Sequence, residues 1–159
     1  MLKISTKTRY AIRALVEMAN DSKRLHLLDQ LALHQNISRK YLENIFALLK
    51  KGSIVQSKVG KNGGFYLREK LETITLLKIY ELMEGDVEIV SCRSRGKSCP
   101  CLSFCPVSPV WSEVSAQIKK TLASKSLKDL CEINRTEANC EESKPTSKKD
   151  QHNCLRLPA

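Results

Sequence analysis

Residues 38–67 read SRKYLENIFALLKKGSIVQSKVGKNGGFYL, and this stretch decides the fold. Its first half predicts a helix that runs to about Lys51, with Ser38 at the N-cap position that serine favours. Large apolar residues recur there at the helical spacing i, i+3, i+4 and i+7, namely Leu42, Ile45, Phe46 and Leu49. The helix is therefore expected to bury one face and to leave a charged face in solvent.

The second half of the stretch predicts a β-hairpin. Gly52 ends the helix, residues 54–59 alternate like a strand, and residues 65–67 return as a second strand. The connecting residues Gly60-Lys61-Asn62-Gly63-Gly64 have the composition of a tight turn. A helix followed by a basic, glycine-tipped hairpin is the result.

Two shorter helices are expected upstream. Apolar residues at helical spacing predict helices over residues 6–20 and 28–35. Asn36 suits the left-handed turn that joins the second of these to the helix capped by Ser38. The order helix, turn, helix, hairpin predicts a mostly α fold with a small β wing, that is, a winged helix-turn-helix head.

The sequence predicts a head of residues 1–85 and three further regions after it. The fourth helix of the head starts at Thr75 and ends at Gly85. Residues 86–109 form a cysteine- and proline-rich loop, and residues 110–131 form a long helix and a short terminal helix. The long helix carries an apolar stripe, namely Trp111, Val114, Ile118 and Leu122. This stripe fits either an intramolecular core or a contact between subunits. Residues 132–159 are polar and lysine-rich, so a disordered tail is expected.

The charge is distributed unevenly. Lys and Arg outnumber Asp and Glu by 27 to 17, which gives a formal net charge of +10. Residues 1–70 hold 14 basic and 5 acidic side chains, and residues 71–159 hold 13 and 12. The excess on the first half is what a nucleic-acid-binding domain shows, although basic chains are also common for other reasons. No uninterrupted apolar segment suggests a signal peptide or a membrane span, so a cytoplasmic protein without a membrane partner is expected.

The helix-turn-helix pattern nominates a set of DNA-contacting residues. A recognition helix places its N-terminal side chains at base edges and phosphates, while a wing brings charge and glycine to the backbone. Glu43 can accept a hydrogen bond from a cytosine amino group. The candidates are Ser38, Arg39, Lys40, Tyr41, Glu43, Lys58, Lys61, Gly63 and Gly64. Taken singly, each of these features also fits an ordinary solvated helix face or turn.

Four of the seven cysteines fall within fourteen residues, as Cys92, Cys99, Cys101 and Cys105. In a reducing compartment such a cluster favours a metal or redox site over a disulfide framework. A structural zinc site usually has two separated Cys pairs, which this crowded run does not provide. Cys131 is expected in the core, and Cys140 and Cys154 fall in the tail.

The motifs Ile37-Ser38-Arg39-Lys40-Tyr41-Leu42-Glu43 and Gly60-Lys61-Asn62-Gly63-Gly64-Phe65-Tyr66-Leu67, with the opening Arg9-Tyr10-Ala11, resemble the IscR/NsrR/CymR family of bacterial regulators. The resemblance covers residues 2–131. It implies a homodimer that binds palindromic operator DNA, with the helix over residues 110–124 as the dimer interface. Several members have an arginine just before the first wing glycine, where this chain has Val59.

The resemblance also implies an iron–sulfur cluster, either 2Fe-2S or 4Fe-4S, with Cys92, Cys99 and Cys105 at the matching spacing. The fourth ligand departs from the pattern. IscR-like members have a histidine where this chain has Ser108, and NsrR-like members have a carboxylate where it reads Thr8-Arg9. Cys101 is one candidate for that position, and an exchangeable site is the other.

These features predict a transcription regulator that senses cluster status, oxygen, nitric oxide or redox state, and not an enzyme. One alternative is a cluster-free, CymR-like repressor that responds to thiol oxidation or to a partner protein. A small iron–sulfur redox protein is a second alternative. It has little support, since the sequence holds no Cys-x-x-Cys motif and no glycine-rich nucleotide loop.

Overall fold

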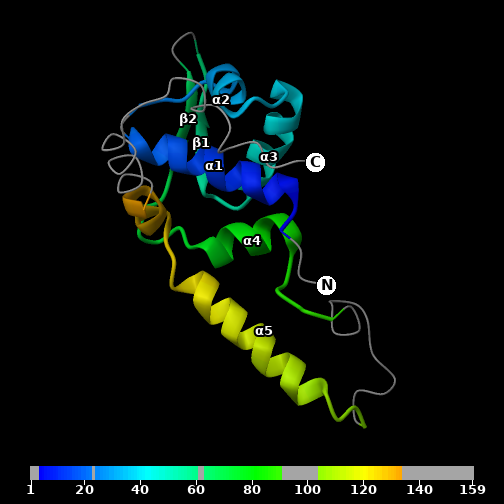
Figure 1. The fold of residues 1–159 in the computed structure, drawn as a ribbon. Helices are drawn as coiled ribbons and strands as arrows, with labels where there is room; N and C mark the ends of the chain where they lie inside the picture. The colour runs from blue at the N-terminus through cyan, green and yellow to red at the C-terminus, as the bar shows by residue number, and fades with distance from the viewer. Residues whose placement is uncertain (1–3, 23, 61–62, 91–103, 134–159) are drawn as a thin grey trace, which may run out of the picture.

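The structure is a computed structural model that describes residues 4–22, 24–60, 63–90 and 104–133. Its elements are α1 (Thr6–Asn20), α2 (Leu28–Gln35), α3 (Arg39–Lys51), β1 (Val55–Lys58), β2 (Gly64–Leu67), α4 (Leu76–Glu84) and α5 (Ser108–Ala123). Residues 127–133 are also helical. Figure 1 shows α1, α2, α3 and the hairpin gathered into a head, with α4 beside it and α5 extending away. A mostly helical fold with a hairpin wing is thereby confirmed.

Three helices of the head begin where a hydroxyl caps them. Ser5 accepts a hydrogen bond from the Thr8 amide at 3.3 Å, and Ser38 accepts one from the Tyr41 amide at 3.3 Å. Thr75 does the same for Lys78 at 3.2 Å. Each cap satisfies an amide that has no backbone partner within its own helix. The starts of these helices can therefore be predicted from the position of a serine or threonine in the sequence.

The core lies between α1, α3, α4 and the inner side of the hairpin. The fully buried side chains include Leu15 and Met18 of α1, the predicted apolar face of α3, and Ile79 of α4. Phe46 of α3 meets Phe65 of β2 edge to face, with ring centroids 4.9 Å apart. This aromatic pair anchors the hairpin to α3.

The hairpin is antiparallel, with Val55 opposite Leu67 and Lys58 opposite Gly64. A third segment pairs with it. The amide and carbonyl of His26, between α1 and α2, exchange hydrogen bonds with those of Phe65, both at 2.8 Å. A Cβ on Gly64 would lie 3.0 Å from the carbonyl oxygen of His26, so a side chain there would crowd this pairing.

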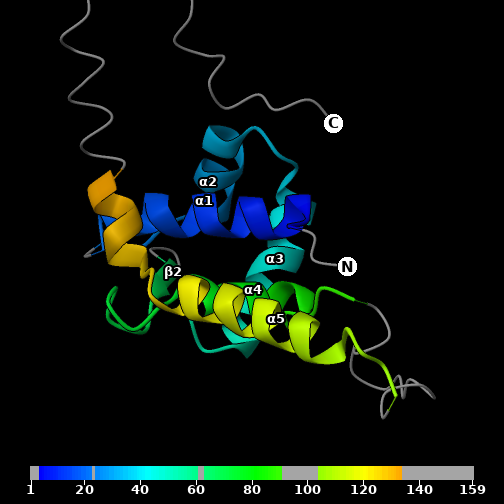
Figure 2. The same cartoon turned by 60° about the horizontal axis from the view of Figure 1, so that its bottom comes forward.

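The C-terminal part differs from the sequence expectation at two boundaries. α5 starts at Ser108, two residues earlier than expected, because Pro109 occupies the first turn, where a missing N–H costs nothing. The short terminal helix runs to residue 133, beyond Cys131. Figure 2 shows α5 passing across α4. None of the helices in the described ranges is both long and apolar enough to cross a membrane.

Candidate nucleic-acid interface

The turn between α2 and α3 fixes the start of the candidate recognition helix. Asn36 is left-handed, with φ 54° and ψ 47°, and its amide donates to the carbonyls of Ala32 and Leu33. Two residues later Ser38 caps α3. Because both sides of the turn are held by hydrogen bonds, α3 leaves α2 in a defined direction.

The exposed face of α3 carries all five candidates that were assigned to it. Ser38, Arg39, Lys40, Tyr41 and Glu43 are exposed, while the apolar face of the same helix is buried. The side chains expected at base edges and phosphates therefore lie on the surface, at the N-terminal end of α3. The N-terminal end of a helix also favours a phosphate through the helix dipole.

Arg39 makes two ion pairs, one with Glu43 of α3 and one with Asp29 of α2. Its Nε donates to Glu43 Oε1 at 3.0 Å, and its Nη1 lies 3.0 Å from Asp29 Oδ1 of α2. Sequence reasoning missed Asp29. The i, i+4 spacing of Arg39 and Glu43 signals their pairing, but the contact with α2 depends on how the two helices cross.

Tyr41 packs against α1 rather than projecting freely. Its ring meets Tyr10 edge to face at 6.1 Å, and the guanidinium carbon of Arg13 lies 5.6 Å from the centre of the Tyr10 ring. The contacts of Arg13 with Tyr10 and of Tyr10 with Tyr41 thus link α1 to α3, and they place the basic Arg13 near the same face. Tyr10 and Arg13 were not among the predicted contact residues.

The wing presents Lys58 at its exposed end, and Val59 beyond it is 94% exposed. A Cβ on Gly63 would lie 2.4 Å from the Lys58 carbonyl oxygen, so this turn requires glycine. Lys50 of α3 donates to Ser57 Oγ of β1 at 2.9 Å, which joins the recognition helix to the wing. Lys61, the fourth basic candidate, lies outside the described residues.

The cysteine loop joins α4 to α5. Cys105 is half-buried, and its carbonyl accepts from the Ser108 amide at 3.2 Å as α5 begins. Cys92, Cys99 and Cys101 lie outside the described residues. Among the described ones, no group of three His, Cys, Asp or Glu side chains is placed to hold a metal. Cys131 is buried in the core, as expected.

The long helix α5 leaves apolar side chains in solvent. Val110 is 52% and Val114 39% exposed, while Trp111 and Ile118 are half-buried. Ser115 is the one residue of α5 that is fully buried. Packing within one chain therefore covers only part of the predicted stripe.

Comparison with known proteins agrees with this geometry. The family model described as "Rrf2: Iron-dependent Transcriptional regulator" matches residues 4–133. Protein rrf2 of Nitratidesulfovibrio vulgaris is 29% identical over 130 residues, covering 81% of this chain and 87% of that protein. The regulator IscR of Vibrio vulnificus is 28% identical over 134 residues, covering 84% and 79%.

Two solved structures share the fold. CymR of B. subtilis, titled the global cysteine regulator, superposes with a TM-score of 0.67 at 29% identity, covering 84% of this chain and 98% of that one. IscR of T. potens gives 0.66 at 26% identity, covering 92% and 94%. These relatives are transcriptional regulators, not enzymes. The chain belongs to the Rrf2 family of helix-turn-helix transcriptional regulators.

Proposed function

We propose that this protein is a homodimeric regulator whose affinity for a palindromic operator depends on an iron–sulfur cluster held in the cysteine loop. Support comes first from the exposed N-terminal end of α3 and from Lys58 on the wing. Two such heads, related by a two-fold axis, would place their recognition helices in successive major grooves, about 34 Å apart. The proposed contacts to bases and phosphates come from Ser38, Arg39, Lys40, Tyr41 and Glu43, and Lys58 contacts the DNA backbone.

The exposed valines of α5 support the dimer. A second copy that packs against Val110 and Val114 would remove this apolar surface from water, which stabilises association. A dimer made through α5 also brings two cysteine loops close to the helix that sets the spacing of the heads, since Cys105 lies three residues before α5.

The observation that carries the sensing role is the position of the four cysteines between α4 and α5. Soft thiolates suit iron–sulfur ligation, and Cys92, Cys99 and Cys105 are the proposed ligands, with Cys101 as the candidate for the fourth position. Cys105 is partly accessible, so its thiol is able to reach a cluster. A bound cluster supplies a centre that responds to iron supply, oxygen or nitric oxide.

The test combines cofactor analysis with DNA binding. Protein purified without oxygen is expected to show visible absorbance bands and matching iron and acid-labile sulfide. Operator affinity, measured on a duplex that the protein enriches from a random-sequence library, is expected to differ between the loaded and cluster-free forms. Equal operator affinity in both forms would contradict the sensing role, but the protein would still be a DNA-binding regulator.

The second candidate is a cluster-free regulator that responds through its thiols or through a partner protein. The structural similarity to CymR of B. subtilis favours it. A colourless protein that takes up no iron on anaerobic reconstitution, with operator affinity altered by thiol oxidation, would support this candidate instead.

A further inference from the structure

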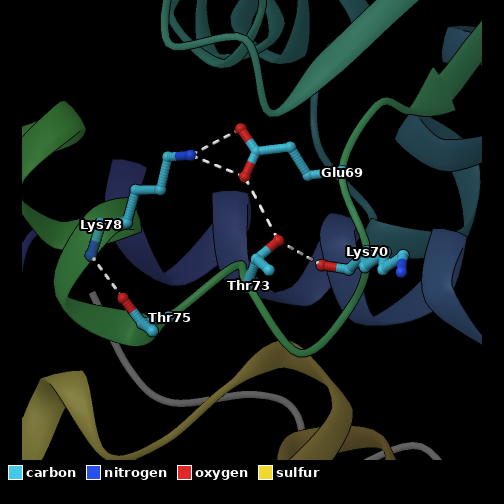
Figure 3. Close-up of polar contacts among 5 residues, drawn as sticks. All are labelled: Glu69, Lys70, Thr73, Thr75 and Lys78. Atoms are coloured by element: carbon cyan, nitrogen blue, oxygen red, sulfur yellow. Dashed lines mark hydrogen bonds and ion pairs between the residues drawn. The ribbon is translucent and has the colours of Figure 1, made fainter.

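The segment that leaves the wing, residues 68–76, is held at several points, and we call it the wing-exit segment. At its start, the amide of Arg68 donates to the carbonyl of Ile54 at 3.0 Å, which closes the base of the hairpin. The next residue is Glu69, and both of its carboxylate oxygens accept a hydrogen bond from Lys78 Nζ of α4, at 2.6 and 2.7 Å. Figure 3 shows this pair, with Thr73 donating to the same carboxylate.

Lys78 is well placed for this contact. It lies in the first turn of α4, where its amide is capped by Thr75, so the backbone from which its side chain extends is fixed. The side chains of Glu69 and Lys78 are 26% and 38% exposed, whereas those of the surface pair Glu72 and Lys128 are 58% and 50% exposed. Partial burial reduces solvent screening, so this pair holds its geometry better than a surface pair does.

The far end of the wing-exit segment is bound to the chain that follows α5. The amide of Leu76 donates a hydrogen bond to the carbonyl of Lys125 at 2.8 Å, and the amide of Leu127 donates one to the carbonyl of Ile74 at 2.8 Å. Ile74 and Leu127 are fully buried. This end is therefore a rigid support, whereas Glu69 lies at the end that meets the hairpin.

We infer that Glu69 and Lys78 are positioning residues for DNA binding, which fix the wing relative to α4 and thereby present Lys58 to the DNA backbone. A two-stranded hairpin depends for its stability on packing against other elements. Phe46 and His26 contact β2, and the pair of Glu69 and Lys78 holds the segment that leaves this strand. Neither residue touches DNA. Because α4 ends where the cysteine loop begins, the same pair is a contact through which a shift of α4 reaches the wing. The inference rests on the proposed DNA-binding role of Lys58.

The test is a double-mutant cycle on the full chain. Affinity for the duplex enriched from a random library is measured for Glu69→Gln, Lys58→Ala and the double variant. Glu69→Gln is expected to weaken binding by about three- to tenfold when Lys58 is present. It is expected to have no further effect once Lys58→Ala has removed the wing contact. The charge swap Glu69→Lys with Lys78→Glu is expected to restore most of the affinity.

Glu72 provides a matched control within the same segment. It pairs with Lys128 of the terminal helix at 3.4 Å and not with α4. Glu72→Gln removes the same charge and is expected to leave affinity unchanged. The melting temperature of every variant shows whether it is folded at the assay temperature. If Glu69→Gln is unfolded there, the DNA affinity of the charge swap tests the inference instead.

Several outcomes would overturn the inference. Glu69→Gln would contradict it by weakening DNA binding equally with and without Lys58, or by not weakening it at all. A folded charge swap that does not recover DNA affinity would contradict it too, as would a Lys58→Ala variant with wild-type affinity. Failure of the wild-type protein to enrich or bind any duplex would instead defeat the proposed function, so the two failures are distinguishable.

Discussion

The guanidinium of Arg39 on α3 lies 3.0 Å from the carboxylate of Asp29 on α2. The same side chain donates to Glu43 one turn further along α3. Arg39, the first residue of α3, is thus held by two carboxylates, which lie beside the surface that we propose binds DNA. Orientation of this kind favours selectivity, and the extra negative charge disfavours indiscriminate binding.

Replacing Asp29 tests that balance. Asp29→Asn is expected to strengthen binding to a scrambled duplex by about twofold, because one negative charge leaves the DNA face. It is expected to lower the ratio of specific to non-specific affinity by about threefold, because Arg39 keeps Glu43 but loses one of the two carboxylates that orient it, in an exposed ion pair. Fluorescence anisotropy on both duplexes measures the ratio. Glu72→Gln, which removes a charge from the wing-exit segment, is the control, and an unchanged ratio for Asp29→Asn contradicts the assignment.

Lys40 and Lys58 are expected to act through phosphates. Alanine at either position should weaken binding to all duplexes alike and reduce the slope of log K against log salt concentration by about 1. Affinities measured over a range of salt concentrations give this slope. Lys120→Ala, in the last turn of α5, is the comparison and should keep the wild-type slope. A selective loss on the enriched duplex alone would point to base contacts instead.

The two described cysteines are expected to behave differently. Cys105→Ala should lose most of the iron and the visible absorbance, because a proposed ligand is gone. Cys131→Ala should keep both and lower the free energy of unfolding by about 1 kcal/mol, since the side chain is buried in the core. Iron, sulfide and absorbance of anaerobic samples, with denaturant unfolding, separate the two. Loss of iron from Cys131→Ala as well would place the site elsewhere.

The dimer is tested on α5. Val114→Glu puts a charge on the exposed apolar side of the helix and is expected to give monomers that bind the palindrome at least tenfold more weakly, about 1.4 kcal/mol. Sedimentation velocity measures the mass. Ala116→Glu adds the same charge to another exposed position of α5 and should remain dimeric. A wild-type protein that sediments as a monomer would contradict the proposed dimer interface on α5.

Acid stability is expected to depend on Glu84. Burial raises the pKa of this carboxyl, but hydrogen bonds from Ser5 and Thr8 outweigh that effect and hold the pKa below its ordinary value of 4.5. A depressed folded-state pKa adds stability above pH 4.5, and this stability is lost as the pH falls through the folded value. Glu84→Gln should therefore show a flatter melting temperature below pH 4.5 than the wild type. Glu81→Gln on α4 controls for the lost charge.

Much of the fold could be predicted because its signals are local. The bounds of α1, α3 and α4 follow from a hydroxyl cap and an apolar period, and those of α2 from an apolar period and the left-handed Asn36 at its end. The structure has all four where the sequence places them. The pairing of His26 with Phe65 was not predicted, since nothing in a single short segment signals a partner far away in the chain. The start of α5 was missed because proline in a first turn resembles proline in a loop.

The sequence by itself determined the helices and the hairpin of the head and the buried face of α3, because periodicity and capping act within a few residues. It also nominated the DNA face of α3 and the cysteine loop. Only the tertiary structure decided that Arg39 is held by Asp29, that Tyr41 packs on Tyr10, and that Glu69 pairs with Lys78. The physical reason is that each of these contacts joins two different elements, so it depends on the angles at which packed helices and strands cross, and those angles are set by the whole core.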